Sequence, residues 1–209
     1  EAGALERISE MTLPRHILTG GLEKVIQRRL ERVPETVQPA LKIAAVAGRQ
    51  LDLAVLGTAA ELDEVGLSNF LTTLTDADVL DVQDNQWRFS HDKLREVIMA
   101  NLSASERQDM HSRVAEAIEQ HHADVDAYGE MLAEHWHQAG NIEKQLQYVP
   151  EVAYRLTQIN ADYTGAIALI ERVLDHAGPQ KSKLNRLIGE AYDVMGQTDE
   201  ARIYYEAGL

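Results

Sequence analysis

Apolar residues recur every three or four positions along most of this chain, which is the spacing of a helix with one buried face. Such stripes run through residues 22–33, 37–47, 94–102, 110–118 and 128–139. Ser103 and Glu106 have the spacing of a capping box, which predicts that a helix begins directly after Ser103. The pattern therefore predicts a mainly α-helical protein.

One segment has a different pattern. Between residues 79 and 90, apolar and polar positions alternate on both sides of Asp84-Asn85, which predicts two short strands joined by a two-residue turn. A short extended piece is expected at residues 50–52, and helices are expected at 34–47, near 53–60 and at 66–76. Three helices followed by one hairpin are the arrangement of a winged helix, so residues 34–102 are predicted to form a winged-helix domain.

The last third of the chain carries an internal repeat. Gly189, Tyr192, Ala201 and Tyr205 match the tetratricopeptide (TPR) pattern, in which small residues lie where two paired helices cross. Turns are expected at Gly196, at Ala161 and at Gly140. The turns at Gly140 and Ala161 are too close together for a full extra pair of helices between them. We therefore expect one helix to be shared or kinked near Pro150. Residues 103–209 are predicted to form TPR-like repeats that continue beyond residue 209.

Composition narrows the function classes. The 209 residues include 34 Asp and Glu against 20 Lys and Arg, which gives a formal net charge of −14, and no cysteine. Disulfides and thiolate zinc sites are therefore excluded, and a reducing cytoplasm is the expected location. No apolar run approaches the roughly 18 residues that a membrane span needs, so no membrane association is expected.

The acidic charge also bears on the winged helix, because DNA-binding members place basic or amide side chains of the third helix in the major groove. The segment expected to form that helix, residues 66–75, contains no Lys or Arg and is followed by Asp76 and Asp78. We therefore expect a structural or protein-binding winged helix. The alternative is a DNA-binding transcription regulator whose TPR arm dimerises or binds an effector.

A family resemblance begins at Trp87-Arg88-Phe89-Ser90-His91-Asp92 and continues to Ile98. This run resembles the end of the winged helix in bacterial STAND-class signal-transduction ATPases, which are relatives of AAA+ proteins. Residues 107–119 and 132–141 resemble the following helix and the start of the superhelical repeats in that family. Leu13-Pro14 and Arg28-Arg29-Leu30 resemble the connection out of the ATPase core, so residues 1–33 are expected to be a linker and helix from a core that these residues do not include.

The resemblance implies a role for Ser90-His91-Asp92. In this class the ATPase core, a helical lid and the winged helix close around ADP, and the histidine of an M-H-D-like motif reaches the β-phosphate. His91 and Asp92 are therefore the candidate nucleotide-sensing residues, acting only together with the missing core. An imidazole N–H at the start of a helix suits a phosphate. The alternative is that His91 simply caps the hairpin-to-helix junction, and that Asp92 orients the imidazole or caps the helix.

Catalytic and metal sites are not expected. The chain has no G-x4-G-K-[ST] phosphate loop and no apolar strand ending in acidic residues that would hold Mg²⁺. No cofactor is therefore expected here, whereas ATP or ADP with Mg²⁺ is implied for a full-length ATPase. His135 and His137 point to different sides of a helix and cannot chelate together. His135 and His111 lie on apolar stripes, which favours core histidines over metal ligands.

These observations predict a non-catalytic regulatory segment of a STAND ATPase. It would couple nucleotide state, through the winged helix, to sensing of a protein, peptide or small effector by the repeats. Its other partner would be its own ATPase core, and nucleic acid is not expected. A plain repeat adaptor without an ATPase is the third possibility.

Overall fold

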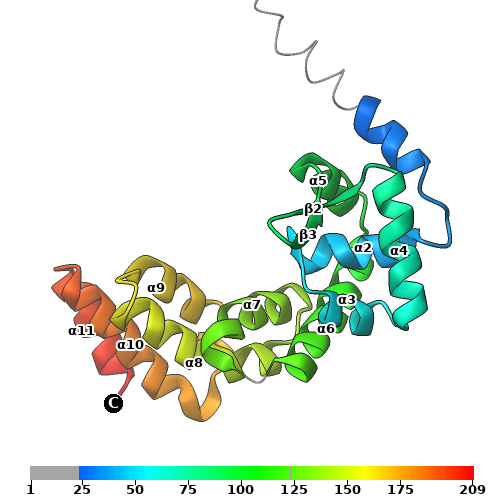
Figure 1. Cartoon of the computed structure of the whole chain (residues 1–209). Helices are drawn as coiled ribbons and strands as arrows, with labels where there is room; N and C mark the ends of the chain where they lie inside the picture. The colour runs from blue at the N-terminus through cyan, green and yellow to red at the C-terminus, as the bar shows by residue number, and fades with distance from the viewer. Residues whose placement is uncertain (1–23, 123) are drawn as a thin grey trace, which may run out of the picture. The chain divides into compact units, whose positions relative to one another are not determined.

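The computed structural model describes residues 24–122 and 124–209, and Figure 1 shows their arrangement. The described residues are mainly helical with one small antiparallel sheet, which confirms the predicted fold class at this level. They divide into two compact units. Unit 1 comprises the described residues up to Leu51 together with Asp63–Asn101, and unit 2 comprises Asp52–Leu62 together with Leu102–Leu209.

Unit 1 contains a helix over residues 24–31, three further helices and the sheet. These elements are α2 (Gln38–Ala47), β1 (Gln50–Leu51), α4 (Glu64–Asp76), β2 (Leu80–Gln83), β3 (Gln86–Phe89) and α5 (Asp92–Ala100). Helix α2 begins four residues later than predicted, because residues 34–37 form a turn and Pro39 takes the first helical turn, where its missing N–H is not needed. Helix α4 begins two residues earlier, because the side chain of Asp63 accepts from the amide of Gly66 at 2.7 Å.

The predicted hairpin is present. Strands β2 and β3 pair antiparallel, with Leu80 opposite Phe89, and the two turn residues both have positive φ, 51° at Asp84 and 61° at Asn85. Asp and Asn tolerate this left-handed backbone better than most residues, which explains the turn. The extended piece at residues 50–51 becomes β1 and pairs with β3, so the strand order is β1-β3-β2.

Unit 1 has one apolar core beneath the sheet and between its helices. Its most buried side chains include Leu41, Ala44, Phe70, Leu74, Val79, Leu80, Phe89 and Leu94. Leu80, Val82, Trp87 and Phe89 share one face of the hairpin, because residues two apart in a strand point to the same side. On this face Leu80 and Phe89 are buried in the core, whereas Val82, nearer the turn, is exposed. The core holds the loop between β3 and α5 in a fixed place on the unit.

Helix α3 (Leu53–Ala59) belongs to unit 2, although it lies in sequence between β1 and α4. It packs on α6 (Ala104–His121). Glu61, just after α3, accepts a hydrogen bond from Arg113 at 2.9 Å, and the Oγ1 of Thr58 lies 2.7 Å from the Nε2 of His121. The chain therefore crosses between the units three times, and the division into units differs from the continuous segment 34–102.

Unit 2 continues as a series of helices joined by short turns. After α6 come α7 (Val125–Gln138), α8 (Ile142–Gln158), α9 (Tyr163–Glu171), two short 3₁₀ turns η1 (Leu174–His176) and η2 (Gly178–Gln180), α10 (Lys181–Val194) and α11 (Thr198–Ala207). Each helix from α6 to α10 packs on the next helix along the chain. The capping box of α6 is confirmed, because the hydroxyl of Ser103 accepts from the amide of Glu106 while the Glu106 carboxylate accepts from the amide of Ser103.

Within the described residues, no helix is both long and apolar enough to cross a membrane.

The three predicted turns share one backbone geometry. Gly140, Ala161 and Gly196 have φ values of 72°, 55° and 76°. The residue after each turn is the N-cap of the following helix, and its ψ lies between 70° and 85°. Helix α8 runs through Pro150 and packs on both α7 and α9. It is therefore shared by two helical hairpins, as the short spacing predicted.

The crossing of α10 and α11 depends on a glycine. Gly189 is buried, and a Cβ placed on it would lie 2.7 Å from the Cδ1 of Tyr205. Gly189→Val should therefore lower the free energy of unfolding by about 1–3 kcal/mol, because the added atoms overpack the crossing. In a Tyr205→Ala background the same change should cost less than half as much. Urea denaturation of the four variants measures this coupling, and equal costs in both backgrounds would show that the contact does not limit the crossing.

Candidate nucleotide-sensing site

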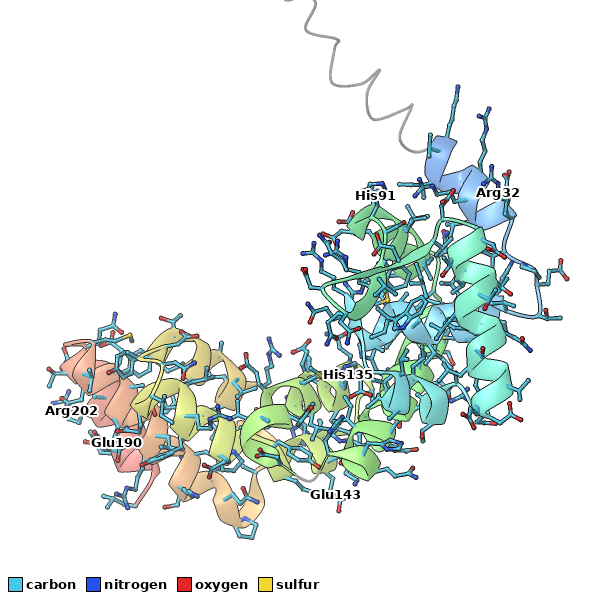
Figure 2. All side chains as sticks on the ribbon, viewed as in Figure 1. Arg32, His91, His135, Glu143, Glu190 and Arg202 are labelled. Atoms are coloured by element: carbon cyan, nitrogen blue, oxygen red, sulfur yellow. The ribbon has the colours of Figure 1, made fainter. Side chains whose placement is uncertain are left out.

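Ser90, His91 and Asp92 form the junction between β3 and α5 in unit 1, and Figure 2 labels His91 at its surface. His91 occupies the N-cap position with an extended backbone, φ −145° and ψ 134°, and its side chain makes no capping hydrogen bond. His91 is exposed. It therefore marks the start of α5 without capping it through its side chain.

Asp92 neither orients the imidazole through a hydrogen bond nor caps the helix. Its Oδ1 lies 3.0 Å from the Nε of Arg49, and both side chains are more than half exposed. Arg49 follows Gly48, whose φ of 140° ends α2 and turns the chain into β1. Sequence reasoning missed Arg49, and the available signal was the glycine followed by an extended piece, which implies a third strand beside the hairpin.

Ser90 is tied to the N-terminal helix of the unit. Its hydroxyl donates to the carbonyl oxygen of Asp78 at 2.7 Å, and the guanidinium of Arg29 donates both to that carbonyl at 2.9 Å and to the Ser90 Oγ at 3.2 Å. Arg32 lies 3.8 Å from the Asp78 carboxylate. The Arg28-Arg29-Leu30 motif and the Ser90-His91-Asp92 motif, about sixty residues apart, therefore meet at one loop.

The loop carries charged side chains of both signs. Arg29, Arg49 and Lys93 lie on or beside it, and the amino end of α5 adds the positive end of its dipole. Each of these cations has a partner. Arg49 pairs with Asp92, Lys93 pairs with Glu96 at 2.8 Å, and Arg29 donates to the Asp78 carbonyl oxygen and to Ser90. The arrangement therefore offers one exposed imidazole at the amino end of α5 and provides no nucleophile with an adjacent base.

Two histidines of unit 2 lie in its core. His111 on α6 and His135 on α7 are 8% and 6% exposed, and their Nδ1 atoms lie 2.9 Å apart (Figure 2 labels His135). The predicted core positions of these two residues are confirmed. Because an Nδ1–Nδ1 hydrogen bond needs one donor and one acceptor, the two rings share a single proton between these atoms. Among the described residues, no group of three or more His, Cys, Asp or Glu is arranged to hold a metal ion.

His122 joins α6 to the start of α3. Its Nε2 lies 2.7 Å from the Oδ2 of Asp52, the N-cap of α3, and its ring stacks on Tyr128 with the centroids 4.0 Å apart. Burial alone would raise the pKa of Asp52, but hydrogen bonds from the amide of Val55, from His122 and from the amide of Ala54 lower it overall. This contact fixes α3 within unit 2.

Glu119 is the polar centre of the α6, α7 and α8 contact. Its Oε1 accepts from the indole N–H of Trp136 at 2.9 Å and from the hydroxyl of Tyr148 at 2.7 Å, and its Oε2 accepts from the Nζ of Lys144 at 2.8 Å. Burial acts to raise the pKa of Glu119, but these three donors lower it overall, and burial together with Glu119 raises the pKa of Tyr148. No local sequence pattern indicates this network, because its members come from three helices.

Glu119 predicts a specific pH dependence. A carboxylate with a lowered folded-state pKa adds stability that is complete above its unfolded pKa, near 4.5, and is lost as the pH falls through the folded pKa. The thermal midpoint of Glu119→Gln should therefore lie well below that of the unchanged chain at pH 7, and the difference should shrink at pH 3. Thermal melts followed by circular dichroism measure both, and a difference that does not change with pH would contradict this account.

No family model, curated protein or solved structure matches this chain.

Proposed function

We propose that this chain is a non-catalytic regulatory segment of a STAND-class signal-transduction ATPase. In this proposal, residues 34–102, which include unit 1 elements and α3, form a winged helix that senses the nucleotide state of an ATPase core. The helices from α6 to α11 form a TPR-like arm that binds an effector. The supporting observation is the exposed imidazole of His91 at the start of α5, in a loop fixed by Arg29 and Ser90. The proposed setting is cytoplasmic.

The secondary structure supports the winged-helix assignment. The helix–strand–helix–helix–hairpin order from α2 to β3 and the strand order β1-β3-β2 are those that a winged helix requires. Helix α5 then follows the hairpin directly, as the resemblance implies. Three turns of one geometry and a glycine at the α10–α11 crossing support the TPR-like assignment in the same way.

The residues present fit a second contact to a nucleotide held elsewhere. When bound in a core, Mg²⁺ and ADP or ATP would supply the phosphoryl chemistry. This chain would supply the imidazole donor of His91 and the amino end of α5. It has no phosphate-binding loop of its own. Coupling to the arm would pass through the chain crossings, since α3 belongs to unit 2 but is joined at both ends to unit 1.

Calorimetry tests whether this chain binds nucleotide without an ATPase core. ADP or ATP titrated into the 209-residue chain should give no tight binding, because one exposed donor cannot hold a nucleotide against water. A sub-micromolar dissociation constant for the chain alone would overturn the proposal.

The DNA-binding alternative has a weak structural basis. Helix α4 would be the recognition helix, yet it contains no Lys or Arg, begins at Glu64 and ends at Asp76. Such a surface repels phosphate. A gel-shift titration of duplex DNA at low salt should therefore show no specific retention, and specific retention would favour a transcription regulator over the ATPase segment.

A further inference from the structure

Unit 2 has a groove beside α10 that is distinct from the nucleotide-sensing loop. We call it the α8–α10 groove, and its volume is about 560 Å³. It is lined by Tyr154 of α8, Pro179 of η2, and Ser182, Lys183, Arg186, Leu187 and Glu190 of α10. Figure 2 labels Glu190 on α10.

The groove has an apolar floor and one exposed aromatic wall. Leu187 is 7% exposed and forms the floor, whereas the Tyr154 side chain is half exposed beside it. The hydroxyl of Ser182 donates to the carbonyl oxygen of Gly208, which holds the first turn of α10 against the end of α11. The groove therefore offers an apolar floor at Leu187 and an exposed ring at Tyr154, where one apolar side chain has a surface to pack on.

The groove is lined by two cations and one carboxylate, whereas acidic residues outnumber basic ones by more than two to one in unit 2. The two cations are Lys183 and Arg186, and the carboxylate is Glu190. The neighbouring Lys181 lies outside the lining and pairs with Asp175 at 3.7 Å. Lys183 forms no ion pair with any described residue, and Arg186 reaches Glu190 only at 3.9 Å across exposed side chains. Cations in the first turn oppose the helix dipole, so a bound anion would relieve an unfavourable arrangement.

We propose that the α8–α10 groove binds an extended acidic peptide segment of a partner protein. Carboxylates of the peptide pair with Lys183 and Arg186, and an apolar side chain packs on Tyr154 above Leu187. A nucleic acid would meet the acidic remainder of unit 2, and a purely apolar helix would leave both cations unpaired. This inference rests on the proposed function, because it specifies the partner class that the TPR-like arm would sense.

Fluorescence anisotropy tests the proposal on the full chain. The probe is a short fluorescein-labelled peptide of glutamate and leucine, and its control has glutamine in place of every glutamate. The variant Lys183→Glu/Arg186→Glu should bind the acidic probe at least about tenfold more weakly, because like charges then face each other. Tyr154→Ala should also weaken binding. Arg202→Glu is the matched control, since Arg202 is an exposed arginine on α11, outside the groove (Figure 2), and should change binding less than twofold.

Each outcome decides the proposal. Binding of the acidic probe that the groove variants reduce and Arg202→Glu does not would support it. No binding, equal binding of the glutamine peptide, or equal losses in all variants would overturn it, as would tighter binding of a labelled oligonucleotide that the same groove variants abolish. Nucleotide calorimetry is independent of this groove, so a failure here leaves the proposed role of unit 1 to its own test.

Discussion

Trp136→Ala is expected to lower the free energy of unfolding of unit 2 by about 3–5 kcal/mol. Trp136 is 1% exposed in α7, its indole donates to Glu119, and the Nζ of Lys144 lies 5.3 Å from its ring centroid. Removing the indole leaves a large cavity and takes one donor from a carboxylate that ties three helices together. The loss therefore combines packing with a damaged polar network.

Met131→Ala on the same helix is the matched control. The Met131 side chain is 44% exposed, so its truncation should change the stability by no more than about 0.5–1 kcal/mol. Guanidinium denaturation followed by far-ultraviolet circular dichroism measures both variants. If Trp136→Ala cost no more than Met131→Ala, then α7 would not be anchored through Trp136.

The second large effect is expected at His91, in the intact ATPase that we propose. His91→Ala should increase the ADP dissociation rate by roughly 10- to 100-fold and raise basal activity, because a hydrogen bond to a charged group contributes about 1.5–3 kcal/mol. Folding should be unaffected, since the His91 side chain is exposed and caps nothing. A fluorescent ADP analogue chased with unlabelled ADP gives the rate.

Two variants separate a phosphate contact from a general loss of local structure. His91→Gln keeps an N–H donor and should recover part of the slow dissociation. Gln83→Ala, an exposed change at the end of β2, should leave the rate unchanged. An unchanged rate in His91→Ala would remove His91 from nucleotide sensing.

Local signals predicted the elements of this fold well. The Asp84-Asn85 turn, the Ser103 capping box and the three turns at Gly140, Ala161 and Gly196 each depend on a few neighbouring residues, and all are present. The predicted start of α2 was wrong, because either of two prolines could occupy the first helical turn. In the structure this residue is Pro39 and not Pro34. Such boundaries depend on a balance of small local energies.

Contacts between segments far apart in the chain were harder to predict from the sequence. Nothing local indicates that α3 packs on α6 and joins unit 2, since this depends on contacts such as Arg113 with Glu61. The loop around His91 shows the same limit. The sequence motif identified His91 and Asp92 as candidate residues. Their surroundings come from distant segments: Arg49, the partner of Asp92, lies about forty residues earlier, and Arg29, the partner of Ser90, about sixty residues earlier.

The most direct test of the central claim compares ADP binding by the proposed ATPase core with and without these 209 residues. Isothermal titration calorimetry of the core alone and of the core followed by this chain gives both dissociation constants. The account predicts that the chain tightens ADP binding by at least about tenfold, because it adds the His91 contact and closes the site against water. Equal dissociation constants in the two proteins would contradict the claim that unit 1 senses the nucleotide.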